Sequence, residues 1–231
     1  MKVLAIETAT TICAASVVSD GRVVGEATLN EKYVHAEKLM TQIDTVLAQS
    51  GFSLGMLDGV AISIGPGSFT GLRIGLSVAK GLAYVTGKPL VAVPTLRALA
   101  QRAVDEHVAK AGEFVLATLD ARRDEVYCQL FRVEGSEAKP VTEEIDKPVN
   151  RVLDEIPAGR VWITGDASDK VLAAAGSREG ASWKRVPESV AQCSAGVAGM
   201  IGEVLLSRGE TADVGSLEPR YIKEFIFKQK S

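Results

Sequence analysis

The chain has 231 residues, of which 46% are hydrophobic and 24% are charged, so it has ample apolar material for a folded core. The formal net charge of −3 argues against a free-standing nucleic-acid binder, which would usually present a basic face. The three cysteines, Cys13, Cys128 and Cys193, form no CxxC pair, which excludes a cysteine zinc knuckle and indicates a reducing compartment. Glu7 comes too early for a signal peptide, and no apolar run reaches the length of a membrane span, so we expect a cytoplasmic protein.

The first part of the chain predicts a three-stranded meander followed by alternating helices and strands. Strands are expected at 3–6, 12–18 and 22–29, then a helix over 34–49, a strand at 60–64, a helix over 69–86, a strand at 90–93 and a helix from Pro94 to about His107. Asp20-Gly21 is the hairpin turn of the meander.

A second unit is predicted to begin near residue 109, because its opening resembles that of the first. A strand at 114–117, the acid Asp120, a strand at 125–133 and the turn Glu134-Gly135 follow the same order as 3–6, Glu7, 12–18 and Asp20-Gly21, which indicates a duplication. The rest of this unit is predicted as a charged surface connection over 134–150, a strand at 161–164, a helix over 189–208 and a basic, solvated tail from Pro219. We therefore expect an N-terminal α/β lobe over 1–108 and a smaller C-terminal α/β lobe over 109–231, with the last helix free to pack back on the first lobe.

The glycine-rich stretch Gly65-Pro66-Gly67-Ser68 ends the strand at 60–64, and Ser68 stands where a helix N-cap belongs. A strand, a glycine turn and a helix N-terminus in succession can hold an anion. The glycine spacing fits neither the dinucleotide-binding nor the P-loop motif, so the alternative is a tight turn that lets the helix pack closely on the sheet.

Two repeated α/β halves, each opening with a hairpin that has an acid at its tip, resemble the actin/sugar-kinase/Hsp70-like (ASKHA) fold with mixed central sheets. In that fold the hairpin tips hold a nucleotide between the lobes, and the first tip here is Glu7 to Thr10. The resemblance implies these candidate cofactor-binding residues: Glu7, Thr8, Thr10, Gly65, Gly67, Ser68 and Asp120. Glu7 and Ala9 stand where catalytic members commonly carry aspartate and glycine, so a degenerate cleft without a cofactor is favoured over weak or interface-shared ATP or ADP binding.

Four segments resemble the bacterial TsaB (YeaZ) family, and the resemblance covers the whole chain. They are Leu4-Ala5-Ile6-Glu7-Thr8-Ala9-Thr10, Gly65-Pro66-Gly67-Ser68-Phe69-Thr70-Gly71-Leu72-Arg73-Ile74-Gly75, Leu119-Asp120-Ala121-Arg122-Arg123-Asp124-Glu125-Val126-Tyr127 and Pro219-Arg220-Tyr221-Ile222. The resemblance implies a part in making threonylcarbamoyladenosine next to the anticodon of tRNAs that read codons beginning with adenosine. It also implies that a metal-dependent paralogue, TsaD, performs the transfer, that the ATPase TsaE joins, and that this chain is a non-catalytic scaffold reaching tRNA through the complex.

The sequence is consistent with a chain that has no catalytic residue and no metal. The paralogue's His-x-x-x-His pair aligns with Thr95 and Leu99, and neither is expected to hold a transition metal. His35 and His107 are the only histidines of the chain, so a histidine-rich catalytic zinc site cannot form, and His35 is interpreted as the start of an ordinary helix. There is no Gly-x-Ser-x-Gly nucleophile motif.

A partner surface is predicted on the helices over 34–49 and 69–86, because a row of glycine and alanine allows another helix to approach closely. The residues expected there are Gly71, Leu72, Gly75, Leu76, Ala79, Leu39 and Ile43. An exposed apolar surface of this kind rarely stays bare, so a homodimer is expected in the absence of the partner. A bulky side chain at position 75 is expected to abolish association while the monomer still folds.

Two other functions compete with the scaffold. An ATP-dependent small-molecule kinase or ATPase of the same fold could use Glu7 and Asp120 to hold magnesium, but the second half lacks a clear adenosine-binding Gly-Gly loop. A metallopeptidase is the third reading, and the missing histidine pair argues against it.

Overall fold

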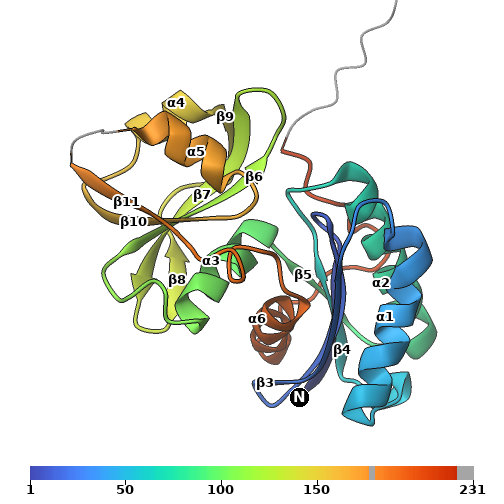
Figure 1. Ribbon diagram of the computed structural model, residues 1–231. Coiled ribbons are helices and arrows are strands. Elements are labelled where there is room, and N and C mark those ends of the chain that lie inside the picture. Colours follow the sequence, from blue (N-terminus) through green and yellow to red (C-terminus); the bar gives the residue numbers. More distant parts are fainter. Residues whose placement is uncertain (177–179, 223–231) are drawn as a thin grey trace, which may run out of the picture.

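The computed structural model describes residues 1–176 and 180–222, which form two α/β lobes side by side (Figure 1). The first lobe has a five-stranded sheet with the strand order β3-β2-β1-β4-β5. Its elements are β1 (Lys2–Glu7), β2 (Ile12–Ser19), β3 (Arg22–Asn30), α1 (His35–Ser50), β4 (Gly59–Ser63), α2 (Phe69–Thr86), β5 (Leu90–Val93) and α3 (Thr95–Asp105), with a short 3-10 turn at Leu54–Met56.

The second lobe has a six-stranded sheet with the order β11-β10-β6-β7-β8, and β9 pairs with β7. Its elements are β6 (Phe114–Asp120), β7 (Glu125–Glu134), β8 (Glu137–Pro140), β9 (Ile145–Pro148), α4 (Val149–Asp154), β10 (Gly159–Thr164), α5 (Ser168–Ala175) and β11 (Ala181–Arg185), and the helix α6 (Ala195–Ser207) follows them in the chain. Over 1–176 and 180–222, none of the helices is long and apolar enough to cross a membrane.

The two sheets repeat one topology strand for strand. In the first, β1 pairs antiparallel with β2, β2 antiparallel with β3, and the parallel strands β4 and β5 continue on the other side of β1. In the second, β6, β7, β8, β10 and β11 pair in the same order and with the same directions. This duplicated arrangement of mixed sheets is the expected ASKHA fold, and it places Glu7 and Asp120 at equivalent strand ends.

Helices cover both faces of the first sheet, which explains why its inner strands are apolar on both sides. In Figure 1, α1 and α2 lie on one face of this sheet and α6 lies on the other. The α1–α2 side packs through Leu39, Ile43 and Leu76, and the α6 side through Ala198 and Ile201. The last helix in the described part of the chain thus packs on the first lobe, although it follows the second sheet in sequence.

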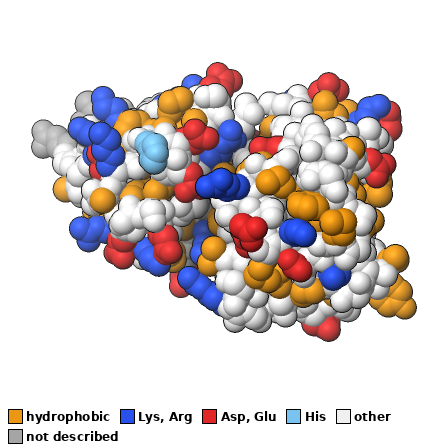
Figure 2. Space-filling model, turned by 90° about the horizontal axis from the view of Figure 1, so that it is seen from below, with side chains coloured by type: hydrophobic (Ala, Val, Ile, Leu, Met, Phe, Trp, Pro, Cys, Tyr) orange, Lys and Arg blue, Asp and Glu red, His pale blue; other side chains and the backbone are white. Residues whose placement is uncertain are grey.

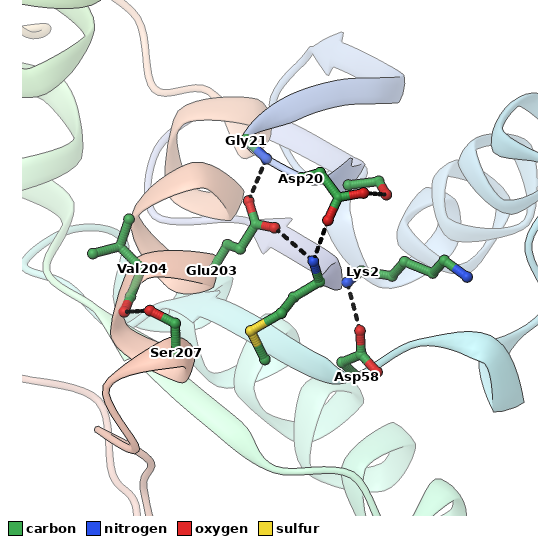
Figure 3. A network of polar contacts seen from close by, with 9 residues as sticks. Lys2, Asp20, Gly21, Asp58, Glu203, Val204 and Ser207 are labelled. Carbon is green, nitrogen blue, oxygen red and sulfur yellow. Dashed lines mark hydrogen bonds and ion pairs between the residues drawn. The ribbon is translucent and has the colours of Figure 1, made fainter.

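Two carboxylates, one on β3 and one on α6 itself, fix α6 in this place. Glu26 on β3 accepts hydrogen bonds from the Ser194 hydroxyl and the Gly196 amide, both 3.1 Å long, and so neutralises the positive end of α6. Glu203 of α6 accepts a hydrogen bond of 2.7 Å from the Gly21 amide and pairs with the amino group of Met1. Figure 3 shows Glu203 pointing toward Gly21 in this network.

Two sequence predictions about the second half were wrong. Residues 134–150 are not a surface connection alone, because they include β8, β9 and the start of α4; β8 is an edge strand whose charged residues face solvent while Ala138 is buried. The predicted helix over 189–208 begins only at Ala195, because Ser194 is the N-cap and accepts a hydrogen bond from the Val197 amide at 3.3 Å.

Candidate functional site

A cleft of about 1050 Å³ separates the two lobes. The first lobe contributes the turn after β1, the start of α1 and the glycine-rich turn before α2. The second lobe contributes the turn between β6 and β7 and Asp166, and the segment Arg220 to Ile222 closes one end. This is the place where the ASKHA resemblance puts the nucleotide of catalytic members, and where a degenerate cleft without a cofactor is the favoured prediction.

The predicted cofactor-binding residues divide into two groups. Thr10, Gly67, Ser68 and Asp120 line the cleft. Glu7, Thr8 and Gly65 are buried and do not line it, so they are not available to a ligand in this structure.

The glycine-rich turn packs directly against the β1–β2 turn, and this contact uses the Ser68 amide at the start of α2. The Ser68 amide donates to the Ala9 carbonyl at 2.6 Å, and the Ala9 amide donates to Oε1 of Glu7 at 2.7 Å. A Cβ added at Gly67 would overlap the Ala9 carbonyl oxygen, so there is no gap between the two turns. The Ser68 hydroxyl accepts from the Gly71 amide at 3.2 Å, which confirms the predicted N-cap.

Glu7 lies at the end of β1 with 0% of its surface exposed. The Ser63 hydroxyl donates to its Oε2 at 2.5 Å, and the Ala9 amide donates to Oε1. Burial raises the pKa of this carboxyl above its ordinary value, and the hydrogen bonds from Ser63 and Ala9 oppose the rise. Glu7 is therefore a structural acid of the core.

We expect Glu7→Gln to change how stability depends on pH. Because the folded-state pKa is raised, ionisation of Glu7 costs folding free energy as the pH climbs from the unfolded-state pKa through the folded-state value. The glutamine has no such cost and still accepts from Ala9, so its free energy of unfolding should gain on the parent's between mildly acidic and neutral pH. Urea denaturation across this range measures the difference, with the exposed Glu31→Gln as the control. A deficit of the Gln variant that grows with pH would contradict the argument.

The carboxylate of the second acid, Asp120, interacts with groups of its own lobe. The Lys170 ammonium pairs with its Oδ1, which also accepts from the Arg122 amide at 3.1 Å. Lys170 further donates to the carbonyl of Arg123 at 2.8 Å, and Arg122 and Arg123 both have left-handed backbones, with φ of 70° and 51°. In a nucleotide site this carboxylate would be free to hold the metal ion that binds the phosphates. Here the ammonium of Lys170 is already paired with it.

The described residues contain no group of histidine, cysteine and acidic side chains that could hold a metal ion. Thr95 and Leu99, which align with the paralogue's histidines, are buried in α3, and the Thr95 hydroxyl accepts from the Gly65 amide at 3.1 Å. His35 begins α1 as predicted, with Nε2 3.1 Å from the Ile12 carbonyl oxygen. All three cysteines are buried, and burial raises the pKa of Cys128 to about 12, far from a reactive thiolate.

The residues predicted for the partner surface do not lie on the surface of the protein. All of them are buried inside the first lobe, where they cannot meet another chain: Gly71, Leu72, Gly75, Leu76, Ala79, Leu39 and Ile43. A Cβ added at Gly71 would overlap the Thr8 carbonyl oxygen, and one at Gly75 would overlap Oγ1 of Thr8. The small-residue row therefore packs on the end of β1, and a bulky residue at position 75 would disrupt the fold itself.

A different set of apolar side chains lies along the seam between the same two helices, and we call it the α1–α2 face. Lys80 donates to the Gly215 carbonyl at 3.1 Å and Gln49 accepts from the Glu26 amide, so these polar edges point away from the seam between the helices. The opposite edges carry partly or fully exposed apolar side chains. The α1–α2 face consists of Ala36, Met40, Ile74, Val78, Leu82 and Val85.

A cluster of side chains at the end of the cleft was not predicted, because the tail from Pro219 is expected to be solvated on its sequence alone. Nε of Arg73 donates to the Tyr221 hydroxyl at 2.8 Å, and its guanidinium lies 3.8 Å from the centre of the Phe69 ring. Arg220 pairs with Glu144 of the second lobe at 3.0 Å. The tail residues Lys223, Lys228 and Lys230 lie outside the described residues.

Comparisons with known proteins agree with this architecture. The family model of TsaD, tRNA N6-adenosine threonylcarbamoyltransferase, matches residues 22–177. The tRNA threonylcarbamoyladenosine biosynthesis protein TsaB of Escherichia coli is 30% identical over 100% of this chain and 98% of its own length. The TsaB protein of Haemophilus influenzae is 37% identical over 55% of this chain and 52% of its own length. The solved structure of YeaZ from Pseudomonas aeruginosa superposes with a TM-score of 0.82, at 28% identity over 95% of this chain and 99% of that one. The chain belongs to the TsaB (YeaZ) family.

Proposed function

We propose that this chain is a non-catalytic subunit for the synthesis of threonylcarbamoyladenosine in tRNA. It supports a TsaD-like catalytic paralogue, which transfers the threonylcarbamoyl group to the N6 amine of the adenosine next to the anticodon, and it works with a TsaE-like ATPase. Family membership supports the pathway, since the E. coli relative of nearly equal length is named for it.

The non-catalytic part of the proposal rests on one observation, which is that internal partners already bind the polar groups of the cleft. A nucleotide-using enzyme of this fold needs free amides for phosphate and free carboxylates for magnesium. Here the Ser68 amide is bonded to Ala9, and Asp120 is paired with Lys170. The Ser68 amide would have to lose its internal partner to bind a phosphate, and the Lys170 ammonium already offsets the charge of the Asp120 carboxylate.

The α1–α2 face is the surface that fits the paralogue. The match to the TsaD family model indicates that the two chains share this part of the fold, so related helix pairs can pack against each other around a pseudo-twofold axis. Without the paralogue, the same face can pair with a second copy of this chain, which gives the homodimer.

Contact with tRNA is proposed to pass through the complex. The net charge is −3, and on the face seen in Figure 2 basic and acidic side chains are interspersed over both lobes. A surface of mixed sign lacks the cationic footprint that non-specific RNA binding requires.

Reconstitution tests the proposal. The chain is mixed with its organism's catalytic paralogue, the ATPase, tRNA and the threonylcarbamoyl donor, and modified adenosine is measured with and without it. We expect modification to require the chain, no activity from the chain alone, and full activity with Asp120→Asn, which changes a cleft carboxylate. ATP hydrolysis or metabolite phosphorylation by the isolated chain that Asp120→Asn abolishes would instead establish the kinase or ATPase reading.

A further inference from the structure

The segment after α6 runs along the first lobe and ends at the cleft. The Ala212 amide donates to the Leu90 carbonyl at 2.8 Å, and the Arg220 amide donates to the Ile64 carbonyl at 2.8 Å. Figure 1 shows this red segment rising past α2 to the space between the lobes. The backbone of Arg220 therefore belongs to the first lobe.

The side chain of Arg220 reaches the other lobe. Its Nη1 lies 3.0 Å from Oε2 of Glu144, which directly precedes β9, and the Glu144 side chain is only 6% exposed. Burial raises the pKa of Glu144, and the Arg220 guanidinium opposes that rise, so the acid depends on this counter-charge. The other ion pairs found between described residues stay within one lobe, counting α6 with the lobe on which it packs.

At their base the lobes are joined in a different way. One apolar cluster around α3 combines Ile12 of the first sheet with Leu96, Leu99, Val115 and Leu119. Apolar contacts of this kind tolerate small rotations, whereas an ion pair across the mouth of the cleft is broken when the lobes separate. The base therefore resembles a hinge, and the Arg220–Glu144 pair joins the lobes at a place outside this apolar cluster.

Tyr221, the residue after Arg220, contacts the first turn of α2. The Tyr221 ring lies 5.2 Å from the Phe69 ring, and Arg73 donates to the Tyr221 hydroxyl. Phe69 and Arg73 precede Ile74 of the α1–α2 face on the same helix. These contacts connect the residue next to Arg220 to the helix that bears the α1–α2 face.

We propose that Arg220 and Glu144 form a latch between the lobes, which sets the width of the cleft and, through Tyr221, the position of the first turn of α2. The latch itself does not depend on the proposed function. Its effect on association with the catalytic paralogue does rest on that function, because the α1–α2 face is the proposed docking surface.

Spin-label distances on the full chain test the latch. Labels at Asp44→Cys on α1 and Arg151→Cys on α4 report the lobe separation, and the native cysteines, all buried, do not compete for the label. Excess unlabelled chain removes distances between molecules. We expect Arg220→Gln to lengthen and broaden the distance distribution, and Glu144→Gln to do the same. Arg160→Gln is the matched control, since it removes an arginine pair of 2.9 Å to Glu113 within the second lobe.

Each outcome decides one part of the proposal. Unchanged distances in folded Arg220→Gln and Glu144→Gln chains, checked by circular dichroism, overturn the latch. Longer distances with about tenfold weaker binding to the paralogue establish both the latch and its coupling. Longer distances with unchanged binding retain the latch and overturn the coupling. The distance measurement uses the isolated chain, so failure of the tRNA reconstitution leaves it intact.

Discussion

We expect Gly71→Ala to destabilise the chain severely, although it adds only one methyl group. The new Cβ would overlap the carbonyl oxygen of Thr8, a buried residue directly after strand β1 whose backbone cannot rotate away. Relief requires α2 to move off the sheet, and overpacking of this kind costs about 3 kcal/mol. That is a large fraction of the roughly 5–15 kcal/mol that separates folded from unfolded proteins. Urea or thermal denaturation followed by circular dichroism measures the loss.

The same substitution of glycine by alanine at Gly81, on another side of α2, provides the control. A Cβ at Gly81 meets no atom within 4 Å, and alanine is about 1 kcal/mol more favourable than glycine in a helix interior. Gly81→Ala should therefore be neutral or stabilising. Equal effects of Gly71→Ala and Gly81→Ala would show that the close contact between α2 and β1 is absent.

This contrast shows what helix periodicity can and cannot predict. The spacing of apolar and small residues predicted α2 with its observed bounds, Phe69–Thr86, and the cap at Ser68. It also identified the row of Gly71, Gly75 and Ala79. Periodicity does not tell whether such a row faces the chain's own sheet or another protein, because that depends on which elements pack on which side.

Elements stabilised by distant partners were the ones that sequence reasoning missed. The edge strand β8 carries charges that favour a loop, and its pairing with β7 is visible only in the sheet. The start of α6 is set by Ser194 together with Glu26 from the opposite end of the chain. A local pattern that includes Val190 and Cys193 cannot contain that information.

The cleft could be predicted in outline because it follows from duplication. The acids Glu7 and Asp120 end equivalent strands, as their places in the repeat indicated. Their environments were not predictable, since Ser63 and Lys170 are far from them in sequence. The same holds for Arg220, whose partner Glu144 lies on the other lobe. The sequence around Arg220 does not indicate that its partner is an acid 76 positions earlier in the chain.

We expect charges on the α1–α2 face to abolish association and, with it, tRNA modification. Met40 is 47% exposed and Val85 is 82% exposed, so Met40→Glu and Val85→Glu leave the core intact. In a complex each carboxylate would be taken out of water without a counter-charge, and hot-spot losses at apolar interfaces exceed about 2 kcal/mol. Combined in one chain, the two substitutions should weaken binding to the catalytic paralogue about a hundredfold or more. Analytical ultracentrifugation of the isolated chain should show a monomer.

The matched control places the same charge elsewhere. Val141 is 52% exposed on the second lobe, so Val141→Glu makes an equivalent change at a surface far from α1 and α2. Its association and modification activity should equal the parent's, and denaturation curves of all variants should coincide because every altered side chain faces water. If Met40→Glu/Val85→Glu associates and supports modification like Val141→Glu, the partner docks elsewhere. The exposed apolar edges of α1 and α2 would then need another explanation, since a helix pair gains nothing in a monomer from leaving Val85 in solvent.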